Sequence, residues 1–324
     1  MRIRDSKAMV PTGKYSKEDL IKEEALRLGF SAIGIAKAEP IPDEIKEAYT
    51  KQVVSGKYGN MEYLRRNEHL RFDPTELLEG CKSIICLAMN YYPPLKQDKE
   101  APQVAYYAYG RDYHKVVKKR SDKLLKFIRE NIDKDVIGRS FADSAPILER
   151  YWAVKSGIGF RGKSGMIILP RKGTFFVLGE LLITTELKPD KPNTFECGKC
   201  TKCIDNCPAK AIDEDGFDAT KCLSYLTIEQ SDELNDTQAG QLGNRLYGCD
   251  TCQKVCPHNR FAQATKETEF MPNKLLFDLS FENLKHLDEQ QYIKIFAGTS
   301  VKRAGYKGLM RTARALLKKR NKKD

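Results

Sequence analysis

Two cysteine runs, with one further cysteine between them, constrain the fold of this 324-residue chain more than any other feature. The first run has the pattern C-x₂-C-x₂-C-x₃-C-P, and the second has the pattern C-x₂-C-x₃-C-P. The first pattern is the spacing with which bacterial-type ferredoxins hold a 4Fe–4S cluster. The cysteines concerned are Cys197, Cys200, Cys203, Cys207, Cys222, Cys249, Cys252 and Cys256. These eight thiolates are the number that two 4Fe–4S clusters require.

Within the first run, three closely spaced cysteines can reach three corners of one cluster, whereas the fourth is carried toward a second cluster. We therefore predict one cluster bound by Cys197, Cys200, Cys203 and Cys256. The other cluster is then bound by Cys207, Cys222, Cys249 and Cys252. Two Cys₄ zinc sites are the alternative interpretation, but such sites usually show two separated C-x₂-C pairs. The crowded first run and the proline after each run favour iron–sulfur clusters over zinc.

The positive charge of the chain is concentrated at its C-terminal end. The formal net charge is +12, and the segment from Lys302 to Asp324 holds ten Lys or Arg residues and one acidic residue. The rest of the chain is therefore nearly neutral. A basic end on such a body predicts a polyanionic partner, either a nucleic acid or an anionic membrane. A solvated tail without a partner is the alternative that charge alone leaves open.

The sequence shows neither an export signal nor a membrane span. The segment Met1–Tyr15 lacks the apolar run of a signal peptide and lacks a twin-arginine motif. No apolar stretch approaches the ~18 residues that a membrane-spanning helix needs. We therefore expect a reducing, cytoplasmic location, which suits iron–sulfur cysteines. The two remaining cysteines, Cys81 and Cys86, flank the start of an apolar strand and are expected to be small core residues.

Hydrophobic periodicity predicts an α/β domain with a mixed sheet up to about Leu187, because helical and strand patterns alternate there. Predicted helices cover residues 17–28, 42–54, 113–132 and 146–155, and predicted strands cover residues 32–36, 83–92 and 137–142. Segments 166–170 and 174–184 are predicted to form a hairpin, and 188–192 a linker. After the cysteine runs, segments 281–296 and 309–320 are predicted to be helical.

The segment Gly157–Ser164 matches the phosphate-binding pattern G-x-x-x-x-G-K-[ST]. A nucleotide-binding loop of this kind needs a strand before it and a helix after it, so that the helix N-terminus meets the phosphates. Here the order is reversed, because a predicted helix precedes the loop and a predicted strand follows it. This context argues against nucleotide hydrolysis. The glycines still permit close backbone approach, which would suit a large cofactor lying across the loop.

Asp143 stands between a predicted strand and a predicted helix, in the sequence Asp143-Ser-Ala-Pro146. From spacing alone, the favoured interpretation is a helix N-cap with a proline early in the helix. The second interpretation is a proton donor, because strand ends in α/β domains face the ligand crevice. No metal-ligand spacing is present among the four histidines, which are interpreted as structural or exposed: His69, His114, His258 and His286.

Several motifs together make the chain similar to the epoxyqueuosine reductases. They are Arg71-x-x-Pro74, Gly110–His114, Asp143–Arg150, Gly157–Lys163, the first cysteine run, Cys222 and Gly243–Cys252. The resemblance implies an α/β (α+β) fold. A nitroreductase-like domain that binds cobalamin would occupy residues 1–187, and a ferredoxin domain with two 4Fe–4S clusters residues 188–262. A helical segment with a basic, tRNA-binding tail would occupy residues 263–324.

The family's activity implies that the protein reduces epoxyqueuosine to queuosine at the wobble position of a tRNA anticodon, with Asp143 as the proton donor. Cobalamin contacts are implied at Arg71, Asp143, Lys163, Ile167, Leu178 and Glu229. Contacts with tRNA are expected from Lys302, Arg303, Arg311 and Arg314, since the chain ends in a basic helix where some members carry a helical-repeat extension. Ser164 departs from the asparagine that many members have after Gly-Lys.

An external donor of the flavodoxin or ferredoxin-reductase type is expected to supply electrons, and the chain is expected to be a monomer without membrane contact. Three other classes of protein remain as alternatives. A reductive dehalogenase-like corrinoid enzyme generally carries an export signal and has no use for a basic tail. A non-catalytic iron–sulfur electron carrier would not bind cobalamin. A cluster-bearing RNA-binding module would hold tRNA without turnover.

Overall fold

A four-stranded sheet of order β1-β2-β7-β4 forms the centre of the N-terminal half. The computed structural model describes residues 15–214 and 216–320, so the segment before Tyr15 and the last four residues of the basic tail lie outside the described residues. The strands are β1 (Ala32–Lys37), β2 (Ser83–Asn90), β7 (Phe176–Ile183) and β4 (Gly138–Phe141). The strands predicted over residues 32–36, 83–92 and 137–142 are confirmed as β1, β2 and β4.

Every neighbouring pair of strands in this sheet is antiparallel, whereas a mixed sheet is predicted from the sequence. The α/β class is confirmed, but the alternation of helices and strands does not fix strand direction, because a helical connection can return the chain in either sense. A parallel pair does occur outside the sheet, between β3 (Gln103–Val104) and β10 (Arg245–Tyr247).

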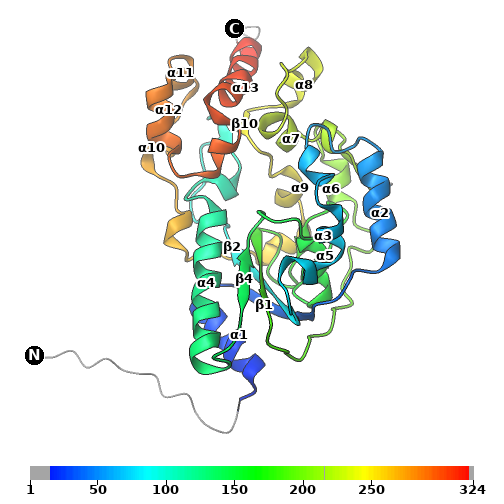
Figure 1. Cartoon of the computed structure of the whole chain (residues 1–324). Coiled ribbons are helices and arrows are strands. Elements are labelled where there is room, and N and C mark those ends of the chain that lie inside the picture. The colour runs from blue at the N-terminus through cyan, green and yellow to red at the C-terminus, as the bar shows by residue number, and fades with distance from the viewer. Residues whose placement is uncertain (1–14, 215, 321–324) are drawn as a thin grey trace, which may run out of the picture.

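Both faces of the sheet are covered, which explains why β2 is almost entirely apolar. On one face, α1 (Lys17–Arg27) and α4 (Tyr113–Asn131) pack against a cluster that includes Ile85. On the other face, α5 (Glu149–Lys155) places Trp152 against Ile84. Figure 1 shows α4 along one side of the sheet and α5 on the opposite side. Alternate β2 residues therefore enter two different cores. Both Cys81 and Cys86 are buried, as predicted.

Two local predictions in this half are wrong. The segments 166–170 and 174–184 do not form a hairpin, because β6 (Ile167–Ile168) pairs with β5 (Phe160–Arg161). The predicted partner strand, β7, instead takes a central position between β2 and β4, where both of its edges are occupied. A single bridge between Leu169 and Gly173 is what joins the two segments. The helix predicted from residue 146 begins at Glu149.

Short elements make up the cysteine-rich region and the C-terminal end. The remaining helices and strands are α2 (Asp43–Val54), α3 (Glu68–Phe72), α6 (Lys202–Asp205), β8 (Ile212–Asp213), β9 (Gly216–Phe217), α7 (Leu223–Ile228), α8 (Asp236–Gln241), α9 (Thr251–Lys254), α10 (Lys274–Phe277), α11 (Phe281–Lys285), α12 (Glu289–Phe296) and α13 (Gly305–Arg320). The 3₁₀ turns are η1 (Glu62–Leu64), η2 (Pro74–Leu77), η3 (Tyr106–Ala108), η4 (Ala219–Lys221), η5 (Pro257–Phe261), η6 (Thr268–Phe270) and η7 (Ser300–Arg303).

The single helix predicted over residues 281–296 is two helices, because Asp288 forms a capping box that starts α12. The last helix, α13, packs on α7, α8 and β10 (Figure 1). One continuous apolar core includes Ile21, Leu223 and Leu309, which come from all three predicted domains. The boundaries near residues 187 and 262 therefore stay predictions.

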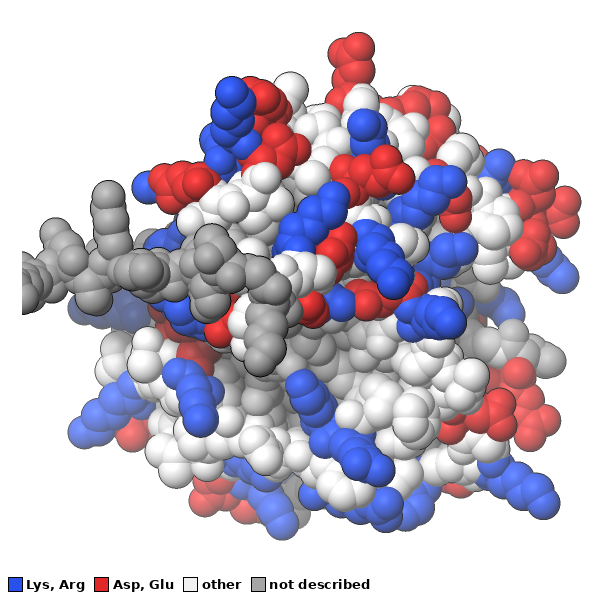
Figure 2. Space-filling view, turned by 90° about the horizontal axis from the view of Figure 1, so that it is seen from below, with Lys and Arg blue, Asp and Glu red and all other residues white. Residues whose placement is uncertain are grey.

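The surface of the body carries both signs of charge. Figure 2 shows one face of the molecule, on which basic and acidic side chains are interspersed. On this face, the distribution agrees with a nearly neutral body. Within residues 15–214 and 216–320, no helix is both long and apolar enough to cross a membrane.

Candidate functional site

The effects that neighbouring thiols have on one another's pKa show which of the seven run cysteines and Cys222 lie close together. Burial raises the thiol pKa of Cys203 and of Cys256, and the charges of Cys197 and Cys200 raise both further. Burial likewise raises the thiol pKa of Cys222, where Cys249 and Cys207 add to the effect. Burial also raises the thiol pKa of Cys252, and the charges of Cys249 and Cys222 raise it further. Most of these neighbours agree with the two ligand sets predicted from spacing, although Cys203 also acts on Cys252, and the ligand sets stay predictions.

A single metal ion and a 4Fe–4S cluster need different spacings between their sulfur ligands. Within the described residues, no three His, Cys, Asp or Glu side chains converge as one metal ion requires. A zinc ion with Zn–S bonds of about 2.3 Å would hold its sulfurs about 3.8 Å apart. The backbone N–H of Ala211 donates a hydrogen bond to Cys207 Sγ at 3.2 Å, and such bonds tune cluster potentials.

The loop Gly157–Ser164 lies against the first cysteine group. A Cβ atom on Gly162 would lie 2.6 Å from the Ile168 side chain and 3.5 Å from Cys197 Sγ. A Cβ on Gly159 would lie 2.6 Å from the carbonyl oxygen of Ile168. The glycines therefore leave room for the chain's own atoms, and the large cofactor expected across the loop stays a prediction. Strands β5 and β6 follow Gly157 and no helix does, so the exclusion of a nucleotide-binding loop is confirmed.

Asp143 is not a helix N-cap, because α5 begins six residues later and Leu148 occupies the cap position. Its backbone adopts the left-handed conformation with φ of 49°, which non-glycine residues rarely take. Its side chain is 63% exposed and accepts a hydrogen bond from the Tyr113 hydroxyl at 2.6 Å. The His114 Nε2 atom lies 3.8 Å from the same carboxylate oxygen. The geometry therefore excludes the role of helix N-cap, which spacing alone favoured for Asp143.

His114 belongs to a polar chain that reaches the C-terminal segment. Its Nδ1 atom lies 2.6 Å from Asp112 Oδ1, and the other Asp112 oxygen lies 2.7 Å from Lys302 Nζ. Burial opposes ionisation of Asp112, but hydrogen bonds from His114 and Lys302 hold its pKa well below the usual range. The Tyr113 and His114 rings are stacked with centroids 4.1 Å apart. The interpretation of His114 as merely structural or exposed missed this position beside Asp143.

A pair of carboxyl groups, Glu149 and Glu180, lies beneath the Asp143 loop. The backbone N–H of Asp143 donates to Glu149 Oε1 at 2.5 Å. Glu149 and Glu180 share a side-chain hydrogen bond. Burial raises the pKa of Glu149 to about 7, with the charge of Asp143 adding to it. Burial, then the charge of Glu149, raises the pKa of Glu180 well above its usual value. The pair therefore retains a proton near neutral pH and anchors the loop.

Tyr63 brings several of the predicted residues to one place. Burial raises the pKa of its hydroxyl to about 12, and the charges of Glu229 and Asp143 raise it as well, while Arg303 and Arg71 oppose this. Arg71 is 8% exposed and donates to the carbonyl oxygen of Tyr63 at 2.9 Å. Its buried Nε has no hydrogen-bond partner within the described residues, as expected of a donor that awaits a ligand.

Three other predicted cofactor contacts lie apart from Tyr63. Ile167 is buried in the apolar cluster beneath the sheet, and Leu178 packs against that cluster from β7. Lys163 is exposed on the loop that follows Gly162. Within the described part of the chain, no hydrogen bond or ion pair links these three residues to the Tyr63 group. The expected contacts at Ile167 and Leu178 involve backbone atoms, so side-chain burial does not exclude them.

The basic residues expected to bind tRNA differ in their surroundings. Arg303 makes a two-point ion pair with Glu229, with N–O distances of 3.0 and 2.8 Å. Arg314 pairs with Glu233 at 2.7 Å on the surface. Arg311 departs from the expectation, because it is 4% exposed and donates to the carbonyl oxygens of Leu226 and Gln230. Its guanidinium joins α13 to α7 and is not accessible to a nucleic acid.

Comparisons with known proteins agree with this arrangement. The model of the family described as epoxyqueuosine reductase QueG, DUF1730, matches residues 71–144, which include Arg71 and Asp143. The model of the 4Fe-4S double cluster binding domain matches residues 196–259, which include all eight cysteines. The first matched region therefore includes Asp143, and the second includes the whole set of predicted cluster ligands.

Similar proteins match along nearly the whole chain. An epoxyqueuosine reductase of Cellulophaga algicola is 40% identical over 299 residues, which cover 92% of this chain and 97% of that protein. The one of Escherichia coli is 38% identical over 88% of this chain and 76% of its own length. A solved epoxyqueuosine reductase with an epoxyqueuosine-modified tRNA stem loop is 30% identical with a TM-score of 0.82, covering 93% of this chain and 80% of that chain. The chain therefore belongs to the epoxyqueuosine reductase family, which are oxidoreductases.

Proposed function

We propose that the protein reduces epoxyqueuosine to queuosine at the wobble position of tRNA. The observation that carries the proposal is Asp143, whose exposed carboxyl accepts a hydrogen bond from Tyr113 and lies 3.8 Å from His114, in a chain that also has a 4Fe–4S double cluster binding domain. The solved relative that holds an epoxyqueuosine-modified tRNA stem loop supports this substrate. A solved relative from Bacillus subtilis, 30% identical, has its aspartate catalytic loop swung out of the active site, which supports a catalytic aspartate on a loop.

Loss of the epoxide oxygen as water consumes two electrons and two protons. In this proposal, Asp143 donates one proton to that oxygen, a form of catalysis worth about 10²–10⁴-fold in rate. The Tyr113 hydroxyl and the His114 ring then stabilise the carboxylate that remains. The bond from the Asp143 backbone N–H to Glu149 holds the loop in its left-handed conformation while the proton is transferred.

We infer that the cofactor is cobalamin. Arg71, with its unpartnered buried Nε, and Glu229, beside Tyr63, fit polar groups at the edge of a large ligand. Lys163 and the backbone around Ile167 and Leu178 would complete the contacts. When bound and reduced, cobalamin would supply electrons to an epoxide carbon. The two clusters, with the ligand sets assigned above, would pass those electrons singly from an external reductant.

The remaining parts of the proposal concern the tRNA and the setting. Lys302, Arg303 and Arg314 would contact phosphates, and their existing acidic partners would be exchanged for the RNA backbone. Use of tRNA as substrate and of iron–sulfur clusters as cofactors suits a reducing, cytoplasmic location. We also propose that the protein is a monomer.

Replacement of Asp143 by Asn tests the proposed role directly. Single turnover of an epoxyqueuosine-modified anticodon stem loop by the chemically reduced enzyme is expected to slow by about 100-fold or more. Iron content and stem-loop affinity are expected to stay at the wild-type level. Asp122→Asn, at an exposed position of α4, is the matched control. Wild-type turnover by Asp143→Asn would overturn the assignment.

A further inference from the structure

Two adjoining cavities form a groove beside both cysteine groups, which we call the basic groove. The larger cavity is about 570 Å³ and reaches Cys256. The smaller is about 240 Å³ and reaches Cys249, and the two share Lys99 and Lys254 in their walls. The residues that define the basic groove are Lys96, Lys99, Lys254, Arg260, Cys249 and Cys256. Because the two cysteines belong to different groups, the groove gives access to both clusters.

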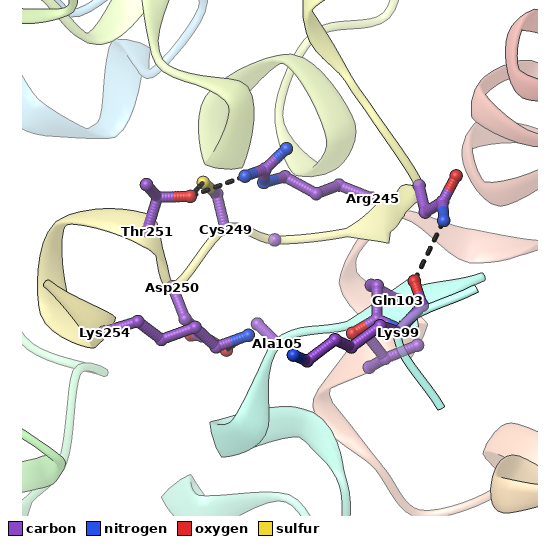
Figure 3. Close-up of a pocket in the computed structure, with 11 residues that line it drawn as sticks. Lys99, Gln103, Ala105, Arg245, Cys249, Asp250, Thr251 and Lys254 are labelled. Carbon is purple, nitrogen blue, oxygen red and sulfur yellow. Dashed lines mark hydrogen bonds and ion pairs between the residues drawn. The ribbon is translucent and has the colours of Figure 1, made fainter. Parts of the chain in front are cut away.

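Three of the four basic side chains that define the groove have no acidic partner among the described residues, and only Lys254 has one. Figure 3 shows Lys99 and Lys254 pointing toward one another across the smaller cavity. Among the described residues, no acidic side chain forms an ion pair with Lys96, Lys99 or Arg260. Asp250 lines the smaller cavity, is 4% exposed and pairs with Lys254 at 3.8 Å, and the same carboxylate oxygen accepts a hydrogen bond from the backbone N–H of Tyr106 at 3.0 Å.

The position of Lys254 connects this charge to the clusters. Lys254 ends α9, two residues after Cys252 and two residues before Cys256. Its ammonium group lies 4.3 Å from the centre of the Tyr106 ring. A basic side chain between two cluster ligands raises the local concentration of a negatively charged partner at the place where an electron must cross.

Apolar side chains flank the basic residues. Leu95 is 65% exposed next to Lys96, and Phe261 is 43% exposed next to Arg260. The guanidinium of Arg260 lies 4.6 Å from the centre of the Phe261 ring. Exposed apolar and aromatic side chains together with arginine are typical of protein–protein interfaces. The composition of the groove therefore fits a folded protein partner.

The groove is separated from the site where the modified base must bind. Tyr106 of η3 lines the larger cavity. The adjacent Tyr107 packs against Tyr113, with ring centres 5.9 Å apart, and the Tyr113 hydroxyl binds Asp143. The 3₁₀ turn thus stands between the groove and Asp143. A partner in the groove can therefore be present while the RNA occupies the catalytic site.

We propose that the basic groove is the docking surface for a small acidic protein that carries one electron at a time. This inference rests on the proposed function, which requires an external reductant. One electron leaves the reduced carrier and enters a cluster, and two such transfers supply the two electrons that loss of the epoxide oxygen consumes. Charge complementarity would speed the encounter, and the interaction would weaken as salt screens it.

The test uses the full chain with its clusters and a reduced bacterial flavodoxin as the acidic carrier. The double variant Lys96→Glu, Lys99→Glu is expected to weaken flavodoxin binding by about tenfold in calorimetric titration at low salt. The rate at which flavodoxin bleaches the cluster absorbance is expected to fall in proportion. Reduction by dithionite, a small reductant, is expected to stay unchanged, which also shows that the clusters are intact.

Lys123→Glu, an exposed charge reversal on α4, is the matched control and should leave flavodoxin binding unchanged. Unchanged flavodoxin binding by the double variant would overturn the proposal. An equal loss of flavodoxin binding in the Lys123→Glu control would overturn it as well. A loss of stem-loop affinity with flavodoxin binding intact would also overturn it, because the groove would then serve RNA.

Failure of this inference can be told apart from failure of the proposed function. Cluster reduction by flavodoxin needs neither tRNA nor Asp143, so it can be measured in the Asp143→Asn variant. If that reduction depends on Lys96 and Lys99 while wild-type enzyme leaves epoxyqueuosine unchanged, the docking surface stands and the proposed function fails. If dithionite-driven turnover is normal and the charge reversals change nothing, the proposed function stands and the docking surface fails.

Discussion

The eight cluster cysteines lie on turns, beside short helices or within helices of four residues, whereas Asp143 has neighbouring side chains from α4, α5 and β7. The cysteines owe their positions to spacing along a short part of the chain. Asp143 owes its position to a backbone bond with Glu149 and to a hydroxyl from Tyr113, which is 30 residues away.

This difference has a physical basis. Short helices with few buried residues cannot hold their own shape, so the cysteine-rich region depends on its clusters for stability, as small metal domains do. The Asp143 loop depends instead on a packed sheet and on two buried carboxyl groups. Loss of one cysteine should therefore abolish binding of a whole cluster. Substitutions near Asp143 should instead lower activity or stability by graded amounts.

The largest expected effect concerns the lone cysteine between the runs. Cys222→Ala should remove one cluster, so that the iron content falls from about eight to about four atoms per chain. Turnover of the modified stem loop should then be lost, since the electron path is broken. Iron and sulfide analysis of anaerobically purified protein is the measurement, with Cys81→Ala, outside the two groups, as control. Full iron content in Cys222→Ala would contradict the assigned ligand sets.

A smaller effect separates two arginines of α13. Arg311→Ala should lower the free energy of unfolding by about 3 kcal/mol, because a buried guanidinium is lost and the carbonyl oxygens of Leu226 and Gln230 lose their donor. Arg314→Ala, at an exposed pair with Glu233, should change it by no more than about 0.5 kcal/mol. Urea unfolding followed by circular dichroism measures both. Equal destabilisation by the two changes would contradict the buried role of Arg311.

The buried carboxyl pair should make stability depend on pH. The pKa of Glu149 is raised from 4.5 to about 7 on folding, so the folded chain binds this proton more tightly than the unfolded chain does. The resulting stabilisation is complete below about pH 4.5 and is lost as the pH rises to about 7. In Glu149→Gln this loss should be absent, so the variant should gain about 2 kcal/mol relative to wild type between pH 5 and pH 7.

Urea unfolding at several pH values measures this difference, and Glu130→Gln, at an exposed position of α4, serves as control. Parallel pH profiles for wild type and Glu149→Gln would show that the pair does not hold a proton near neutral pH.

The smallest expected effect concerns the tRNA surface. Arg314→Ala should weaken binding of the tRNA stem loop by about threefold and reduce the dependence of affinity on salt by about one phosphate contact. Fluorescence anisotropy across a salt series is the measurement. Lys126→Ala, on the exposed side of α4, is the control. An unchanged salt slope for Arg314→Ala would remove this residue from the RNA surface.

The sequence predicted the parts of the molecule whose geometry is local. The strand predicted over residues 83–92 is found as β2, and the helix predicted over residues 113–132 is found as α4, because each follows from a local pattern of apolar residues. The direction of the strands and the pairing of β7 depend on long-range packing, which periodicity does not encode. The sequence analysis treated Arg311 as one more basic residue of the tail. Nothing in the sequence around it shows that its guanidinium donates hydrogen bonds to two carbonyl oxygens.

The same limit applies to the site. The roles of Tyr63, His114 and Glu180 arise where separate elements meet, so spacing could not reveal them. One usable signal was the short stretch Asp112-Tyr-His114, in which an acid at a helix start precedes a histidine by two residues. That spacing lets Asp112 accept hydrogen bonds from both the backbone and the ring of His114.

The central claim is that this chain removes the epoxide oxygen of epoxyqueuosine with the help of Asp143. The most direct measurement is mass spectrometry of tRNA nucleosides from a bacterial strain that lacks its own epoxyqueuosine reductase and expresses this chain. The account predicts that the wild-type chain restores queuosine and that Asp143→Asn leaves epoxyqueuosine. Persistence of epoxyqueuosine with an expressed, cluster-loaded wild-type chain, or restoration of queuosine by the variant, would contradict it.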